Sequence, residues 1–143
     1  MAYTKEAIAV WQHDTVFEGR AGSGFTVPMD GQSKEGASPM EMVVLGLAGC
    51  TAADVIDILR KKRQDVTAFE VRVVGQRADE HPRKYTTMEV VYTVTGRNVD
   101  PAAVARAIEL SEAKYCSVSA TLRASVAMAS RYEIHEVELA PVA

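Results

Sequence analysis

The sequence contains very little cysteine: Cys50 and Cys116 are its only two. This scarcity excludes a scaffold held together by several disulfides. The two cysteines stand far apart without a C-x-x-C motif, and the three histidines are scattered along the chain. The sequence therefore has no thioredoxin-type motif and no metal-ligand spacing, so we expect neither a bound metal nor a cofactor.

A strong charge of one sign is also missing. The chain has 16 Lys and Arg residues against 19 Asp and Glu residues, for a net charge of −3. This balance lacks the basic footprint of a nucleic-acid-binding protein. No segment resembles a signal peptide, and Glu41 interrupts the apolar run over residues 40–53. That run is shorter than the roughly 20 residues needed to span a bilayer. We therefore expect a cytoplasmic protein without a nucleic-acid or membrane partner.

The overall composition is typical of a globular protein. Hydrophobic residues make up 48% of the 143 residues and charged residues 24%. Both fractions are close to the averages of folded domains. A chain of this length can bury a sizeable core, so we expect a single domain over residues 1–143.

Hydrophobic alternation predicts several strands. Three short strands with glycine-rich turns between them are expected over residues 6–12, 15–18 and 25–29. A longer hairpin and a final strand are expected over residues 69–75, 85–95 and 126–134. With helices between these groups, the order predicts an α+β fold with antiparallel sheet. It differs from the βαβ alternation of a nucleotide-binding fold.

A long helix is predicted to begin after Ser38. Ser38 suits the N-cap, Pro39 the first helical position, and Glu41 the closing position of a capping box. Basic residues up to Arg63 favour a C-terminal end near that position. The first half of this helix is apolar on every side, which is typical of a helix that is buried all round. One small domain rarely encloses such a helix alone, so we infer a homodimer in which a partner subunit covers it.

The two cysteines are the candidate reactive groups. Cys50 lies where the apolar half of the long helix gives way to its amphipathic half. Cys116 precedes a short predicted helix over residues 118–122, whose first N–H groups favour a thiolate. A thiolate is the nucleophile in sulfur chemistry, and a second thiol can resolve the product. Composition alone favours the alternative that both cysteines are buried packing residues.

One glycine-rich segment could supply a cation to such a thiolate. Arg20 lies within the sequence Gly19–Gly24, which lacks the Lys-Ser/Thr ending of a phosphate-binding loop. We therefore discount a nucleotide site there and keep Arg20 as a candidate partner of the thiolate.

Two blocks of sequence resemble the OsmC/Ohr family of osmotically induced and organic-hydroperoxide-resistance proteins, in its YhfA-like branch. The first block is Ser-Pro-Met-Glu-Met at residues 38–42 with Gly-Cys-Thr at residues 49–51. The second is Lys-Tyr-Cys-Ser-Val at residues 114–118. The resemblance extends from the first strands to Glu133. It implies an intertwined homodimer, in which antiparallel sheets from both chains wrap around two long central helices.

The same resemblance implies thiol peroxidase activity in oxidative-stress defence. By that analogy, Cys50 attacks an organic hydroperoxide or peroxide and becomes a sulfenic acid. Cys116 resolves the sulfenic acid as a disulfide, and a dithiol reductant restores both thiols. Arg20 corresponds to the arginine that such proteins hold against the thiolate. Two other functions are open on the same fold: a non-catalytic module that binds a small apolar ligand, and a redox sensor.

One position departs from the family pattern. The peroxidase members have a glutamate near the start of the cysteine helix, and Met40 stands at that position here. Glu35 and Glu112 are the acids that could hold the arginine instead. Without such an acid, Cys50 stays mostly protonated at neutral pH, so we expect slow peroxide reduction.

Overall fold

The computed structural model describes residues 3–137, which fall into two compact units with the boundary between residues 43 and 44. The N-terminal unit is a meander of three antiparallel strands, β1 (Ala7–His13), β2 (Val16–Ala21) and β3 (Thr26–Asp30). The predicted short strands are confirmed. The expectation of a single domain over residues 1–143 stays a prediction.

The long helix α1 (Pro39–Lys61) begins as the sequence predicts. The Ser38 hydroxyl accepts a hydrogen bond from the Glu41 N–H at 3.2 Å, and the Glu41 carboxylate accepts one from the Ser38 N–H at 2.9 Å. This is the reciprocal capping box. Ser33 also donates to the Glu41 carboxylate at 2.9 Å. Glu41 is therefore engaged in starting the helix.

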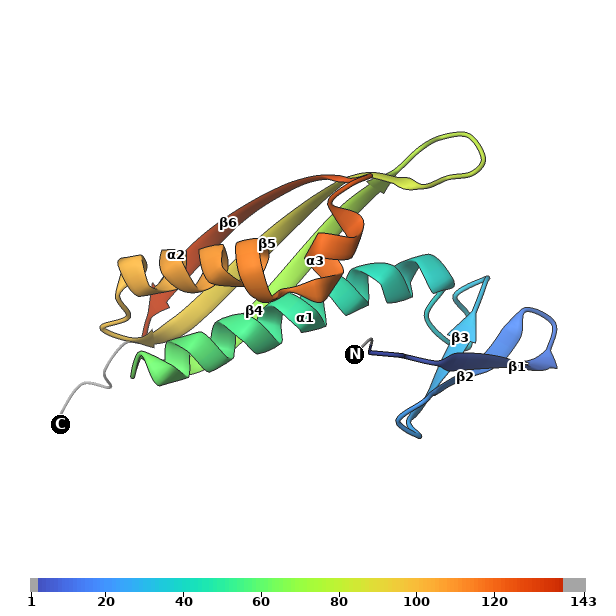
Figure 1. Ribbon diagram of the computed structural model, residues 1–143, viewed down its shortest axis with the longest axis horizontal. Helices are drawn as coiled ribbons and strands as arrows, with labels where there is room; N and C mark the ends of the chain where they lie inside the picture. Colours follow the sequence, from blue (N-terminus) through green and yellow to red (C-terminus); the bar gives the residue numbers. More distant parts are fainter. Residues whose placement is uncertain (1–2, 138–143) are drawn as a thin grey trace, which may run out of the picture. The chain divides into compact units, whose positions relative to one another are not determined.

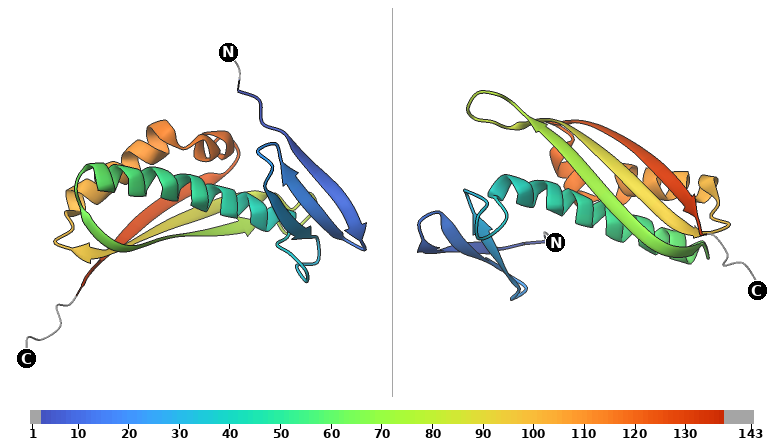
Figure 2. Two further views of the ribbon diagram at one scale, coloured as in Figure 1. Left: turned by 90° about the horizontal axis from the view of Figure 1, so that it is seen from below. Right: turned by 180° about the vertical axis from the view of Figure 1, so that it is seen from behind.

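The C-terminal unit is a three-stranded sheet in the order β4–β5–β6, with β4 (Asp65–Arg77), β5 (Tyr85–Arg97) and β6 (Ala127–Glu136). Helices α2 (Pro101–Leu110) and α3 (Ser117–Leu122) connect β5 to β6. Between them lies a five-residue π-helical turn, η1 (Ser111–Tyr115). Both connecting helices lie on the same face of the sheet as α1 (Figures 1 and 2).

The expectation of purely antiparallel sheet is wrong for this unit. β4 and β5 are antiparallel, as predicted, but β6 pairs with β5 in parallel. The cause is the connection: a parallel neighbour needs a crossover, and the segment from α2 to α3 supplies one. The sheet is therefore mixed, and β5–α2–η1–α3–β6 forms one crossover unit.

The core of the C-terminal unit lies between β5 and the helices. Met88, Val90, Tyr92 and Val94 alternate along β5 and are buried. Helix α1 faces them with a buried row at every fourth position, Leu47, Thr51, Val55 and Leu59. Helix α2 adds Val104, Ala107 and Ile108. This spacing places the buried side chains of each helix on a single face.

The opposite face of α1 remains open in the single chain. Leu45 is 55% exposed, and Gly46 and Gly49 have no other atoms within 4 Å of an added Cβ. A single chain therefore does not cover this helix on all sides, and the expectation that a partner subunit covers it stays a prediction. The whole of α1, unlike the run over residues 40–53, is long and apolar enough by length and composition to cross a membrane. Its buried row identifies it as the core helix of the domain.

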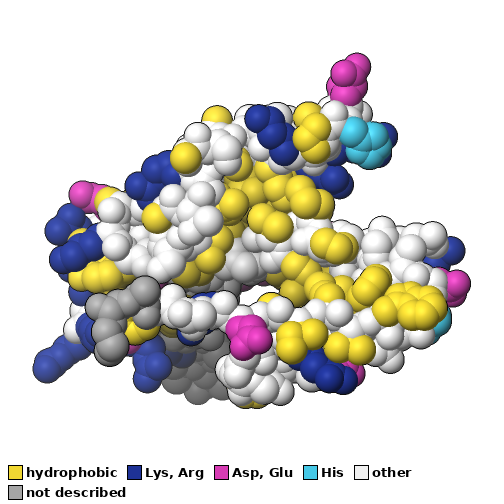
Figure 3. Space-filling view, turned by 45° about the vertical axis from the view of Figure 1, so that its right-hand side comes forward, with side chains coloured by type: hydrophobic (Ala, Val, Ile, Leu, Met, Phe, Trp, Pro, Cys, Tyr) yellow, Lys and Arg dark blue, Asp and Glu magenta, His cyan; other side chains and the backbone are white. Residues whose placement is uncertain are grey.

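Large hydrophobic side chains remain exposed on both units, and Figure 3 shows hydrophobic side chains grouped on the molecular surface. On the N-terminal unit they include Ile8, Trp11 and Phe25. On the C-terminal unit they include Leu45, Val74 and Tyr115. Apolar surface of this kind marks interaction surfaces when it is contiguous.

Candidate functional site

The fold brings the two cysteines together. Cys50 lies in the middle of α1, and Cys116 lies between η1 and α3. Their two sulfur atoms and a carboxylate oxygen of Asp54 all lie within 4.8 Å of one another. Both cysteines are free thiols. The sequence predicts a two-cysteine site, and the fold places the two sulfur atoms close together. Their joining in a disulfide stays a prediction.

Local helix geometry explains the position of Asp54. It follows Cys50 by one helical turn, and residues four apart lie on the same face of a helix. The Ser111 hydroxyl donates a hydrogen bond to Oδ2 of Asp54 at 3.0 Å. Ser111 is fully buried at the start of η1. A buried donor from another element therefore orients the carboxylate beside the thiols.

A change in helix type positions Cys116. The Cys116 N–H donates to the carbonyl oxygen of Ser111 at 2.7 Å, closing the wide turn of η1. Cys116 is then the N-cap of α3, where its sulfur accepts a hydrogen bond from the Ser119 N–H at 3.3 Å. Single π-helical turns are frequent at functional sites because the extra residue redirects the chain. Here that turn directs Cys116 towards α1.

The two thiols differ in accessibility and environment. Cys50 is partly exposed, whereas Cys116 is only 3% exposed. Burial raises the pKa of the Cys116 thiol above its ordinary value, and the nearby Cys50 raises it further. The Ser119 hydrogen bonds oppose this rise, and the pKa remains raised. Cys50 is therefore the more accessible of the two thiols.

The negative charge of this site lacks a paired cation. Among residues 3–137, no Lys, Arg or His side chain forms an ion pair with Asp54. The neighbouring acid on the same helix, Asp57, pairs with Lys61 at the surface at 2.8 Å. Asp54 therefore lies beside the two thiols without an ion-pair partner in the described part of the chain.

A small network of hydrogen bonds lies next to the site. The buried Tyr92 hydroxyl donates to the Glu112 carboxylate at 2.9 Å, and Ser130 donates to the same carboxylate at 3.2 Å. Burial, followed by the Glu112 carboxylate, raises the pKa of Tyr92 far above its ordinary value. Tyr92 therefore remains a protonated donor.

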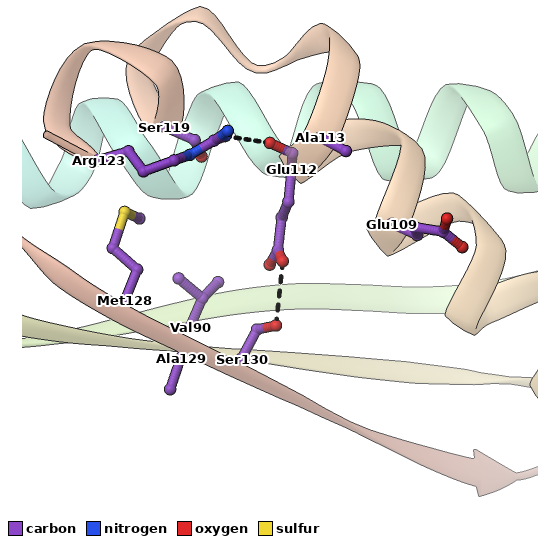
Figure 4. Close-up of a pocket in the computed structure, with 9 residues that line it drawn as sticks. All are labelled: Val90, Glu109, Glu112, Ala113, Ser119, Arg123, Met128, Ala129 and Ser130. Carbon is purple, nitrogen blue, oxygen red and sulfur yellow. Dashed lines mark hydrogen bonds between the residues drawn. The ribbon is translucent and has the colours of Figure 1, made fainter.

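A cavity of about 360 Å³ adjoins this hydrogen-bond network, between the helical crossover and the sheet (Figure 4). Val90, Met128 and Ala129 supply apolar walls from the strands. Arg123 extends towards the main-chain oxygen of Glu112 and donates to it, while the Glu112 carboxylate points to Ser130. The cavity has room for a small apolar molecule.

The remaining predicted site residues have other partners. Arg20 lies on β2 in the N-terminal unit, where its Nε donates to Glu18 at 2.6 Å. Its role against Cys50 stays a prediction. Glu35 bonds to His13 at 2.8 Å, and Glu112 bonds to Tyr92. The carboxylates of these two acids are therefore occupied in other contacts.

Sequence reasoning missed Asp54 and Ser111. The four-residue spacing between Cys50 and Asp54 was a usable signal, because both had been placed on one helix. Ser111 gave no such signal, since its contact with Asp54 spans 57 residues of sequence.

Comparisons with known proteins identify the class that this fold and site define. A family model described as OsmC-like protein matches residues 31–131. The chain therefore belongs to the OsmC-like family, as the cysteine blocks indicate. Its α+β fold, with two sheets and a long central helix, is the OsmC-like fold.

Individual proteins of known sequence or structure show how similar this chain is to members of the family. Protein YhfA of Escherichia coli strain K12 is 44% identical over 130 residues, covering 90% of this chain and 97% of that protein. A crystal structure of a hypothetical protein from Aquifex aeolicus VF5 has a TM-score of 0.86 at 29% identity, covering 96% of this chain and 100% of that chain. The organic hydroperoxide resistance protein OhrB of Bacillus subtilis has a TM-score of 0.60 at 14% identity, covering 92% and 98%. This last similarity concerns the fold alone.

Proposed function

We propose that this protein is a cytoplasmic, homodimeric thiol peroxidase that reduces organic hydroperoxides or peroxide with Cys50 and Cys116. The observation that carries the proposal is the pair of free thiols within 4.8 Å, one accessible and one buried. Family membership supports it, because the family includes organic hydroperoxide resistance proteins.

The reaction has two steps. The Cys50 thiolate attacks the terminal oxygen of the hydroperoxide, the O–O bond breaks, and the alcohol leaves after protonation. Cys50 is then a sulfenic acid. The Cys116 sulfur attacks the Cys50 sulfur, water leaves, and a disulfide forms. An external dithiol reduces this disulfide by thiol exchange and is itself oxidised.

We expect this peroxidase to be slow. Met40 replaces the glutamate that would hold an arginine, and Glu41 is engaged in the capping box. Asp54 adds a negative charge beside the thiols. No acid at position 40 therefore holds a cation against the Cys50 thiolate, which is the reactive form. Arg20 is the cation we propose for this role.

The homodimer follows from the open face of α1. Leu45 is exposed there, and the neighbouring Gly46 and Gly49 allow the backbone of another helix to approach closely. Covering this face with the same helix of a second chain would remove apolar surface from water, which is the main favourable term in association.

A second candidate function is binding of a small apolar ligand without turnover. The 360 Å³ cavity beside Glu112 favours it. Ser119, which lines this cavity, also donates its N–H to the Cys116 sulfur, so the cavity adjoins the cysteine pair. A redox sensor that reports by forming the Cys50–Cys116 disulfide is a separate alternative on the same fold.

Stopped-flow consumption of cumene hydroperoxide by the reduced protein tests the proposal. One equivalent of peroxide should be consumed per cysteine pair, with loss of both thiols. Cys50→Ser should abolish the reaction. Cys116→Ser should consume peroxide but accumulate a sulfenic acid that dimedone traps. Peroxide consumption by Cys50→Ser at the unmodified rate would refute the assignment.

A further inference from the structure

We propose that Cys50, Asp54 and Cys116 form a binding site for a thiophilic divalent cation of the zinc class when both thiols are reduced. The sequence has no metal-ligand spacing because these residues come from separate elements, and folding joins them. The proposal does not depend on peroxide reduction, since it concerns only the reduced residues and their geometry.

The distances suit a tetrahedral ion. Zinc lies about 2.3 Å from thiolate sulfur and about 2.0–2.2 Å from carboxylate oxygen, which places tetrahedral ligand atoms about 3.5–3.8 Å apart. The three ligand atoms here lie within 4.8 Å of one another. Small side-chain rotations therefore bring them onto one ion. Three protein ligands leave the fourth position open, as in exchangeable and catalytic sites.

The neighbours of these ligands are arranged as around protein-bound metals. The buried Ser111 hydroxyl donates to Asp54 at 3.0 Å and fixes the carboxylate. The Ser119 N–H donates to the Cys116 sulfur at 3.3 Å, a contact that stabilises a thiolate. Such outer hydrogen bonds orient the ligands and tune the affinity of metal sites.

The charges of the three ligands are compatible with a divalent cation. Two thiolates and a carboxylate would gather three negative charges, and Asp54 has no ion-pair partner among the described residues. Cys116 is buried, so water compensates its charge poorly. A divalent ion replaces the two thiol protons, which leave to solvent as the two metal–sulfur bonds form. The cluster carries one negative charge with both thiols protonated, and it carries the same charge with the divalent ion bound.

Metal binding and disulfide formation exclude one another. Each uses the same two sulfur atoms, so oxidation of the pair breaks both metal–sulfur bonds and releases the ion. A bound ion should, in turn, protect both thiols from alkylation. The site would thus hold metal only in the reduced protein.

Cobalt is the probe for the test, because cobalt–thiolate bonds give a charge-transfer absorption band. Fully reduced protein is titrated with Co²⁺ under anaerobic conditions, and Zn²⁺ is then added to displace it. We expect one Co²⁺ per chain with a sulfur-to-cobalt band, loss of the band with Zn²⁺, and no band in the disulfide form.

Two acids on α1 provide a matched comparison. Asp54→Asn should weaken cobalt binding roughly tenfold or more, because a charged ligand is lost. Asp57→Asn should bind within about twofold of the unmodified protein, since Asp57 pairs with Lys61 at the surface. Ser111→Ala should give a smaller loss than Asp54→Asn. It serves as the second variant if Asp54→Asn does not fold.

Two results would overturn the proposal: no sulfur-to-cobalt band at stoichiometric metal with both thiols titrated as free, or equal affinity in Asp54→Asn and Asp57→Asn. Neither result bears on peroxide reduction, which is measured without metal. Conversely, a protein that binds cobalt as described but reduces no peroxide would refute the proposed peroxidase activity. It would still support the metal site.

Discussion

The buried hydroxyl of Ser111 donates to the Asp54 carboxylate across 57 residues of sequence, and this contact ties η1 to α1 at the cysteine pair. Ser111→Ala should destabilise the fold by about 1–3 kcal/mol, because the partly buried carboxylate loses its donor. Urea unfolding of the reduced protein measures the change. Ser117→Ala, at an exposed position of α3, is the control and should shift stability by less than about 0.5 kcal/mol. Equal effects of the two substitutions would show that the Ser111 contact contributes nothing.

Asp30 should make the protein sensitive to acid. The Thr15 hydroxyl, followed by the N–H groups of the next turn, lowers the pKa of Asp30 from 3.8 to about 2. Because the folded-state pKa lies below the unfolded value, the stabilisation is present above about pH 4. It is lost as the pH falls towards 2.

The comparison variant for this prediction is Asp30→Asn. Its urea midpoint should fall below that of the unmodified protein at pH 6, and the difference should shrink between pH 4 and pH 2. A difference that stays constant over this interval would show that Asp30 ionises at its ordinary pKa in the folded protein.

The open face of α1 predicts an obligate dimer. Sedimentation of the unmodified protein at micromolar concentration should give twice the chain mass. Gly49→Arg should dissociate the dimer, because a long charged side chain would enter the proposed helix contact. Ala105→Arg, at an exposed position of α2, is the matched control and should leave the dimer intact. A cooperatively folded monomer in the unmodified protein would contradict the prediction.

Placing a glutamate at position 40 tests what activates Cys50. Met40→Glu should raise the rate of peroxide reduction if Arg20 is the cation that the new carboxylate holds against the thiolate. The readout is the stopped-flow rate constant with cumene hydroperoxide. The gain should disappear in the double variant Met40→Glu with Arg20→Ala. Fast turnover in the unmodified protein would mean that another group already activates the thiol.

Local signals in the sequence were sufficient for much of the fold. The start of α1 is determined by Ser38, Pro39 and Glu41, which lie within one helical turn and satisfy one another. The hairpin of β4 and β5 follows from alternation and a short connection. The parallel pairing of β6 was missed because strand direction depends on the whole crossover from α2 to α3 rather than on the strand's own residues.

The candidate site was also predictable only in part from local sequence signals. The two cysteines stood out because the chain has no others. Asp54 could have been added from its helical spacing to Cys50. The π-helical turn and the Ser111 contact depend on long-range packing around Cys116, and no local pattern specifies them.

The most direct test of the account is the product formed when the reduced protein meets one equivalent of cumene hydroperoxide. Peptide mass spectrometry under non-reducing conditions should find Cys50 and Cys116 joined in a disulfide within one chain, with two thiols lost per peroxide consumed. The disulfide should be absent from Cys50→Ser and from the untreated protein. Peroxide consumption that leaves both thiols free, or oxidises Cys50 to sulfinic acid without any disulfide, would contradict the two-cysteine mechanism.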